Sequence, residues 1–155
     1  MRCYRIASKQ YAHKLSGEGA RLYGGRWNSE GHSLIYAAET SSLAMLEILV
    51  HINARRVGAN FCIMVIDVPD ALVAAPILTN DLPLHWDKNP YGYATQSLGD
   101  DFILKGEKVA ISVPSAVNSL ECNYLINDRH LNFNKVSLVE VLPIDFDRRL
   151  LEGSQ

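Results

Sequence analysis

The run Phe-Cys-Ile-Met-Val-Ile at positions 61–66 constrains the fold of this chain more than any other segment. A short and nearly continuous apolar run is typical of a strand that is covered on both faces, because an exposed face would alternate with polar residues. We therefore expect residues 60–68 to form a central, covered strand. With 155 residues the chain is long enough to bury such a strand in one core, and we expect residues 1–155 to form a single domain.

The rest of the pattern predicts more strands than helices. The predicted strands cover residues 2–7, 33–38, 108–113, 122–126 and 136–142, the predicted helices 41–55 and 95–104, and the predicted loops 16–29 and 69–93. The helices do not alternate with the strands, as repeated βαβ units would require. We therefore expect an α+β fold, in which helices flank a mixed β-sheet core.

The predicted helix over residues 41–55 is apolar on nearly all sides, which indicates a buried helix. Glu47 lies within it, on the same side as Leu43 and Val50 at 100° per residue. A carboxylate is rare at such a place unless it is paired or used in chemistry. A bond to His51 or to an arginine elsewhere would explain Glu47 structurally, and stabilisation of a positive charge would explain it functionally. Both interpretations stay open at this point.

The glycine-rich stretch Gly24-Gly25-Arg26-Trp27-Asn28 carries a cation and an indole. The two glycines allow a ligand to approach the backbone closely, and the planar fork of Arg26 matches the oxygens of a phosphate. The alternative is a plain turn, in which Arg26 makes a surface salt bridge and Trp27 anchors the loop in the core. The stretch by itself does not decide between the two.

Two hydroxyls follow at the ends of predicted strands. Tyr36 lies ten residues after Arg26, and its ring suits either core packing or a ligand site. Ser115 comes just after a strand end, where serine is either a turn residue or a functional hydroxyl. No Gly-x-Ser-x-Gly elbow surrounds it, so we do not expect a serine nucleophile.

The composition argues against several classes of protein. The net charge is −2 and no basic block is longer than two residues, whereas a nucleic-acid-binding surface needs a basic face. Apolar runs stay well below the ~20 residues that cross a bilayer, and the first residues lack the apolar core of a signal peptide, so we expect no membrane segment and a cytoplasmic location. The three cysteines form no Cys-x-x-Cys pair and the five histidines show no ligand spacing, so we predict no metal site.

Five motifs occur in a set order along nearly the whole chain. They are Tyr-Arg-Ile (4–6), Gly-Glu-Gly-Ala-Arg-Leu-Tyr-Gly-Gly-Arg-Trp-Asn (17–28), Ile-Tyr-Ala-Ala (35–38), Leu-Ala-Met-Leu-Glu-Ile-Leu-Val-His (43–51) and Val-Pro-Ser-Ala (113–116). In this order and spacing they resemble the RES-domain proteins, toxins of bacterial toxin–antitoxin pairs that are named for an arginine, a glutamate and a serine. The resemblance implies that Arg26, Glu47 and Ser115 take those three places and that Tyr36 is a fourth active-site residue. Further candidates on the same match, for substrate binding, are Arg21, Tyr23 and Trp27.

The chain departs from the pattern of that family at two places. Phe102 stands where a tryptophan is usual after Gly99-Asp100, and Asn127-Asp128-Arg129-His130 replaces the usual Asn-Pro-x-His. Neither change touches the residues expected to do chemistry. We therefore expect the departures to alter local packing.

The resemblance also implies a fold and an activity. It implies the fold of the ADP-ribosyltransferase toxins, with NAD⁺ as the substrate and no other cofactor. Family members degrade NAD⁺ by hydrolysis or phosphorolysis, and some transfer ADP-ribose to a protein instead. The usual partner is an antitoxin with a helix-turn-helix domain that covers the active site. A catalytically silent domain that only binds a partner is the alternative of a different class.

On this interpretation the residues have separate roles. Nicotinamide leaves NAD⁺ as a neutral group, so the site must stabilise the ribosyl cation that remains, as in glycoside hydrolysis. Glu47 would do this if it stays ionised, and we therefore expect a cationic or hydroxyl neighbour beside it. Arg26 would hold the pyrophosphate or a ribose-linked phosphate, and Tyr36 would stack on or bond to the nicotinamide riboside part. Ser115 would orient Glu47 or a ribose hydroxyl. Whether water, phosphate or a protein attacks the cation stays open.

Overall fold

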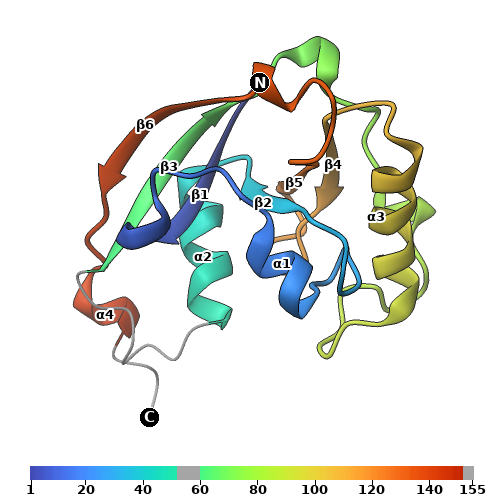
Figure 1. Ribbon diagram of the computed structural model, residues 1–155. Helices are drawn as coiled ribbons and strands as arrows, with labels where there is room; N and C mark the ends of the chain where they lie inside the picture. The colour runs from blue at the N-terminus through green and yellow to red at the C-terminus, as the bar shows by residue number, and fades with distance from the viewer. Residues whose placement is uncertain (52–59, 152–155) are drawn as a thin grey trace.

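The computed structural model describes residues 1–51 and 60–151, and within them six antiparallel strands form one sheet in the order β4-β5-β2-β1-β3-β6 (Figure 1). The strands are β1 (Arg2–Ser8), β2 (Ile35–Ala38), β3 (Phe61–Asp67), β4 (Ala110–Pro114), β5 (Cys122–Ile126) and β6 (Ser137–Pro143). The helices are α1 (Glu18–Tyr23), α2 (Ser41–His51), α3 (Tyr93–Lys105) and α4 (Arg148–Leu151). The α+β class is as expected. In the same described ranges, no helix is long and apolar enough to cross a membrane.

The strand β3 is covered on both faces, as its apolar run predicted. Cys62 through Ile66 are buried, and their side chains alternate between two clusters, with Met64 in one and Ile63 in the other. The position of β3 corrects the expectation, however, since it lies between β1 and the edge strand β6 and not at the centre of the sheet. Side chains above and below the sheet supply the cover, so burial did not require a central position.

The named strands are all antiparallel, although we expected a mixed sheet. The strand β1 pairs antiparallel with both β2 and β3, so these two strands run parallel to each other on either side of it. The helix α2 connects β2 to β3 and therefore makes a crossover between parallel strands that do not touch. This insertion of β1 explains why a β–α–β connection is present without a parallel strand pair.

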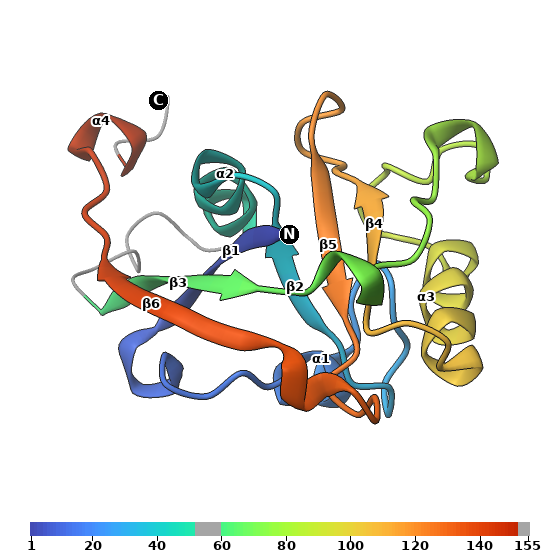
Figure 2. The same cartoon turned by 90° about the horizontal axis from the view of Figure 1, so that it is seen from above.

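The sheet is nearly divided between β1 and β2. These strands share the single residue pair Tyr4 and Ala38, whereas β1 pairs with β3 from Arg2 to Ser8. The helix α2 packs on the half that contains β1 and β3, and α3 packs on the half that contains β4 and β5 (Figure 2). Strand pairing thus joins the two halves at one residue pair only, and β1 and β2 are unpaired beside it.

The short helix α1 lies inside the segment that we expected to be a loop. Glycines flank and interrupt it, which is why the sequence pattern indicated irregular structure. Gly17 precedes the helix, and a Cβ atom there would lie 2.6 Å from the backbone of Leu34, so the close approach requires glycine. Gly24 ends it with a φ of 67°. Tertiary contacts stabilise this helix in place of local propensity.

The helix α2 is not buried on all sides, contrary to the prediction. Leu43 and Ala44 are buried against the sheet, but Leu46 is 41% exposed and Val50 is 60% exposed. The helix packs on the sheet through one side only, and the side that carries Leu46 and Val50 is exposed. Its predicted continuation over residues 52–55 lies outside the described residues.

The other predicted elements are confirmed with shifted ends. The second strand begins at Ile35 and not at residue 33, and β4 covers 110–114 where we expected 108–113. The helix α3 ends where Gly106 adopts a left-handed φ of 58°, as its glycine stop predicted. The segment 69–92 is irregular apart from short 3₁₀ turns.

Candidate active site

A cavity lies between the two halves of the sheet, beside the single pair of β1 and β2. Its volume of about 830 Å³ is within the size range of small-molecule sites. Its walls come from both halves, since Arg5 of β1 and Tyr36 of β2 both line it. Side chains of α1 and α2 add further walls, as do the segment 87–91 and Asn123 of β5. The cavity is therefore lined from both sides of the boundary between β1 and β2, where strand pairing is limited to one residue pair.

Glu47 lines this cavity from α2 and is held by two neutral donors. Its Oε1 atom accepts hydrogen bonds from Ser115 Oγ (2.8 Å) and from Asn123 Nδ2 (2.5 Å). The expected hydroxyl neighbour is thus confirmed. A hydroxyl and an amide orient the carboxyl group, and neither donor is itself charged.

Ser115 lies behind Glu47, buried at the end of β4. Its Oγ atom also accepts hydrogen bonds from the backbone amides of Val117 and Asn118, both at 3.1 Å. These two bonds fix the hydroxyl and aim its proton at the carboxylate. The hydroxyl of Ser115 therefore donates to Glu47 and also accepts from the backbone of the turn that follows β4.

Arg26 lines the opposite part of the cavity and is held by carbonyl groups. Its Nη1 atom donates to the carbonyl oxygens of Trp86 (2.6 Å) and Lys88 (2.9 Å). Its guanidinium carbon lies 5.8 Å from the centre of the Tyr91 ring, within the range of a cation–π contact. The surface salt bridge of the alternative interpretation is thus replaced by contacts to neutral groups.

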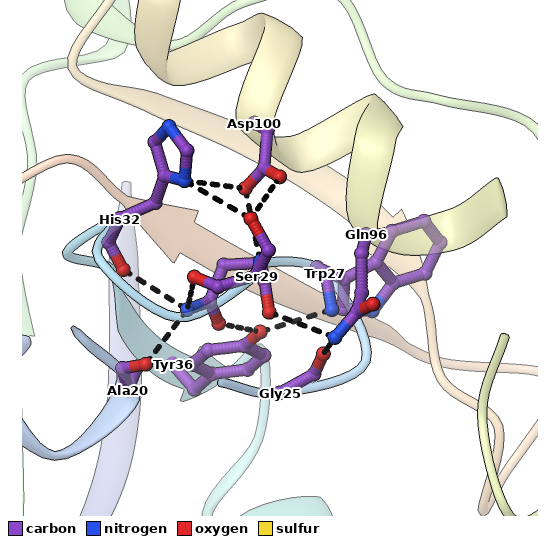
Figure 3. A network of polar contacts seen from close by, with 9 residues as sticks. Ala20, Gly25, Trp27, Ser29, His32, Tyr36, Gln96 and Asp100 are labelled. Carbon is purple, nitrogen blue, oxygen red and sulfur yellow. Dashed lines mark hydrogen bonds and ion pairs between the residues drawn. The ribbon is translucent and has the colours of Figure 1, made fainter. Parts of the chain in front are cut away.

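The loop that carries Arg26 is held by two amide side chains (Figure 3). Asn28 is fully buried and donates from Nδ2 to three backbone carbonyl oxygens, those of Ala20, Ser29 and His32. Gln96 of α3 donates to the carbonyl oxygens of Gly25 and Asn28. The backbone of the loop is therefore fixed before any ligand arrives.

The same loop is tied to α3 by a second polar cluster (Figure 3). Ser29 Oγ donates to Asp100 Oδ2 (2.5 Å), and the backbone amide of Ser29 donates to Asp100 Oδ1. His32 Nδ1 lies 3.1 Å from Ser29 Oγ and 3.4 Å from Asp100 Oδ1. These side chains lie outside the lining of the cavity, so they support the loop from behind.

Tyr36 has its hydroxyl committed to this loop. The hydroxyl donates to Asn28 Oδ1 (2.6 Å) and accepts from the backbone amide of Trp27 (3.0 Å). Burial raises the pKa of Tyr36 above its usual value, so the hydroxyl stays a neutral donor. A Cβ atom at Gly25 would lie 2.5 Å from this hydroxyl, which explains the glycine there. Tyr36 also belongs to the lining of the cavity.

The three further candidates have different positions. Trp27 is 2% exposed and its indole packs on Trp86, with ring centres 5.9 Å apart. Tyr23 is 79% exposed and stands at the rim of the cavity. Arg21 is paired with Glu18 (2.6 Å) and is not part of the lining. Trp27 thus anchors the loop, and Arg21 is not brought to the site.

Arg5 is a cavity residue that the sequence reasoning missed. It lies in β1, its Nη1 atom donates to the carbonyl oxygen of Ser16 (3.0 Å), and burial lowers its pKa while nearby Asp128 opposes that shift. A half-buried cation beside a cavity is complementary to an anionic ligand. The signal was present as a charged residue in the middle of an apolar strand.

Asn123 was also missed, because an amide in a predicted strand has many structural uses. Its place follows from strand pairing, since Asn123 of β5 lies opposite Val113 of β4, two residues before Ser115. The same pairing brings both donors to one carboxylate oxygen. Only the strand register shows this.

The two departures from the family pattern have local structural roles. Asp128 Oδ2 accepts a hydrogen bond from the backbone amide of Gly17 (2.8 Å), at the start of α1. Phe102 of α3 is buried and packs in a cluster with Ile111 and Leu125. Both residues act on packing next to the site and make no contact with Glu47 or Arg26 among the hydrogen bonds of the described residues. In that part of the chain, no group of three or more His, Cys, Asp or Glu is placed to hold a metal ion.

Comparison with known proteins finds matches over nearly the whole chain. The RES domain family matches residues 2–147. The "Toxin Res" of Yersinia enterocolitica is 37% identical over 152 residues, covering 97% of this chain and 99% of the relative. The "Prs ADP-ribosylating toxin" of Sphingobium sp. is 35% identical over 153 residues, covering 96% and 95%.

A solved structure has the same fold. A chain from the crystal structure of the MbcT–MbcA toxin–antitoxin complex of M. tuberculosis superposes with a TM-score of 0.73, covering 92% of this chain and 83% of that one at 22% sequence identity. This likeness supports the α+β architecture. The family match and the curated relatives show that the chain belongs to the RES-domain family.

Proposed function

We propose that this chain is the toxin of a toxin–antitoxin pair and that it cleaves NAD⁺ at the bond between nicotinamide and ribose. The observation that carries the proposal is the carboxylate of Glu47, held by two neutral donors in a cavity that also contains Arg26 and Arg5. A carboxylate and two guanidinium groups match a ligand that develops a positive charge and carries phosphates, and Asp87 is a second acidic residue of the same lining. The relatives named as toxins support the biological role.

The chemical step follows from the charges in the cavity. The bond between C1′ of the ribose and the ring nitrogen of nicotinamide breaks, and its electron pair leaves with the neutral nicotinamide. Glu47 stabilises the ribosyl cation that remains, through its charge and through hydrogen bonds to ribose hydroxyls. Water or phosphate then adds to C1′ and releases a proton. No metal and no resident cofactor is needed for this sequence.

The other residues bind and orient the substrate. Arg26 and Arg5 hold the pyrophosphate, the ring of Tyr36 contacts the nicotinamide riboside part, and Ser115 keeps Glu47 in place. Tyr23 offers its exposed ring at the rim. Trp27 anchors the loop in the core and also belongs to the lining of the cavity, where it remains a candidate for substrate binding.

A second candidate function is the transfer of ADP-ribose to a protein. The relative named as an ADP-ribosylating toxin favours it. The chemistry at Glu47 would be the same, and only the attacking group would differ. In that case ADP-ribose stays on the target and is not released into solution.

We further propose that the partner is an antitoxin with a helix-turn-helix domain and that it covers the cavity. Its support is a rim of exposed apolar side chains around the cavity, contributed by different elements: Tyr23 (79% exposed), Val50 (60%), Tyr91 (37%) and Val117 (37%). Such a rim is typical of a surface that another protein covers. A chain of similar fold occurs in a toxin–antitoxin complex.

Product analysis tests the proposed function. Purified chain is mixed with NAD⁺, with and without phosphate, and nicotinamide and the ADP-ribosyl product are separated by chromatography. We expect nicotinamide release by the wild-type chain and none above background by a folded Glu47→Gln variant. Free ADP-ribose identifies hydrolysis, and the 1″-phosphate of ADP-ribose identifies phosphorolysis. ADP-ribose that stays attached to proteins of an added extract identifies transfer. A folded wild-type chain that releases no nicotinamide in any of these mixtures would contradict NAD⁺ cleavage.

A further inference from the structure

The two tryptophans of this chain contact each other across the molecule. Trp27 and Trp86 lie far apart in sequence, yet their ring centres are 5.9 Å apart with an angle of 38° between the planes. Trp27 is 2% exposed and belongs to the core below α3. It therefore gives Trp86 a fixed surface to pack on.

Trp86 is the one anchored side chain of an exposed segment. From Leu84 to Ala94 every residue except Trp86 is exposed. The backbone-to-backbone hydrogen bonds of this stretch are local, from the amide of Trp86 to Pro83 and from that of Lys88 to His85. Apart from its contacts with Arg26, the stretch is placed against the rest of the chain by the indole of Trp86.

This segment holds the guanidinium group of Arg26. The carbonyl oxygens of Trp86 and Lys88 both accept from Nη1, at 2.6 and 2.9 Å. A guanidinium group carries five N–H donors, two of them on Nη1. Among residues 1–51 and 60–151, no hydrogen bond is recorded for Nε or Nη2 of Arg26, and these two donors form the edge that binds two oxygens of a phosphate in parallel.

We propose that Trp86 is a positioning residue for Arg26, an inference that rests on the proposed function. By packing on Trp27, it holds its own carbonyl group and that of Lys88 where they orient Nη1. The free edge of Arg26 is then presented to a phosphate of the substrate in the cavity. Trp86 itself does not line the cavity, but Asp87, Asn89 and Tyr91 of the same segment do, so the Arg26→Ala background is needed to separate an effect through Arg26 from one through these residues.

Steady-state kinetics with NAD⁺ tests this role in four variants. They are Trp86→Ala, Trp86→Phe, Arg26→Ala and the double variant with both alanines, and Leu84→Ala is the matched control because Leu84 is 86% exposed in the same segment. We expect Trp86→Ala to raise KM about tenfold, as the weakening of one charged hydrogen bond does, with kcat changed less than about threefold. Trp86→Phe restores most of the loss, and Leu84→Ala changes neither constant.

The double variant separates positioning from packing. If Trp86 acts through Arg26, adding Trp86→Ala to Arg26→Ala leaves KM unchanged, so the two effects are not additive. Thermal unfolding and the near-ultraviolet circular dichroism of the tryptophan pair show whether each variant is folded. A rise in KM caused by Trp86→Ala that is as large in the Arg26→Ala background as in the wild-type chain would overturn the inference, as would a folded Trp86→Ala chain with wild-type KM.

Failure of this inference can be told from failure of the proposed function. If the wild-type chain releases nicotinamide and the two alanine effects add, only the role of Trp86 is wrong. If the folded wild-type chain releases no nicotinamide, the proposed function and this inference are both wrong. If Trp86→Ala does not fold, the Trp86→Phe variant decides, since a change in KM that persists without Arg26 contradicts the inference.

Discussion

The two walls of the cavity hold their charged groups in similar ways but with different supports. On one wall, Glu47 accepts from the side chains of Ser115 and Asn123, which belong to the paired strands β4 and β5 and the turn after them. On the other wall, Arg26 donates to two backbone carbonyl groups of an exposed segment. In the described part of the chain, each group is thus held by neutral partners and not by the opposite charge.

This comparison teaches why a cavity can present a carboxylate and a guanidinium together. A direct ion pair between them would cancel both charges and would have to be broken by each substrate. Neutral partners fix the geometry and leave the charges available. The wall of Glu47 rests on the sheet, whereas the wall of Arg26 rests on a segment with one anchored side chain. Variants on the two walls should therefore differ in kind.

The largest expected effect is the loss of the carboxylate charge. Glu47→Gln keeps the size of the side chain and can still accept from Ser115. We expect kcat for NAD⁺ cleavage to fall by ~10²–10³, since an interaction with the developing cation is lost. Release of nicotinamide under saturating NAD⁺ measures this. A folded variant with unchanged kcat would show that the charge of Glu47 does not act on the reaction.

On the opposite wall we expect a loss of binding. Arg26→Lys keeps the charge but removes the fork, and we expect KM to rise by about tenfold to a hundredfold with a smaller change in kcat. Arg21→Lys is the matched control, because Arg21 pairs with Glu18 outside the cavity and should change neither constant. Equal effects of the two variants would mean that the bound phosphate does not contact Arg26.

A smaller effect is expected from the supports of Glu47. Ser115→Ala and Asn123→Ala each remove one of two donors to the same oxygen, and the other donor stays. We expect each to lower kcat by about tenfold, consistent with one hydrogen bond to a charged group. The double variant should approach the loss seen in Glu47→Gln. If either single variant already reaches that loss, one donor alone sets the position of Glu47.

The smallest expected effect concerns stability and not the reaction. Tyr36→Phe leaves Asn28 Oδ1 and the amide of Trp27 without their shared partner. We expect the free energy of unfolding to fall by about 1–3 kcal/mol, the usual result for unsatisfied buried polar groups. Denaturant unfolding at neutral pH measures it. A variant of unchanged stability would show that water or a rotated side chain replaces the hydroxyl.

The pH dependence of unfolding gives an independent check on Tyr36. Its pKa is raised in the folded chain above the ordinary value of 10.0, so above that pH the unfolded chain loses a proton that the folded chain keeps. The stabilising contribution is therefore fully present below pH 10.0 and is lost as the pH rises further. We expect the stability of Tyr36→Phe to fall less steeply above pH 10.0 than that of the wild-type chain. If the stability of both chains falls equally steeply above pH 10.0, the raised pKa of Tyr36 in the folded chain is contradicted.

Local structure was largely predictable from the sequence. The apolar run of β3, the glycine stop after α3 and the strand before Ser115 each depend on residues close together in the chain. The prediction of a loop over α1 was wrong because its glycines lower the local helix propensity, whereas contacts with distant residues stabilise the helix. The prediction of a buried α2 was wrong because residue type alone does not show how much of a sheet a helix covers.

The α+β class, the family and the candidates Arg26, Tyr36, Glu47 and Ser115 were predictable from residue order alone, since they follow from local periodicity and from motifs in order. The single residue pair between β1 and β2, and the cavity beside it, are visible only in the folded chain. The tertiary structure also added Arg5 to that cavity and left Arg21 outside. The physical reason is that strand register sets which distant side chains meet, and no spacing within one segment encodes it.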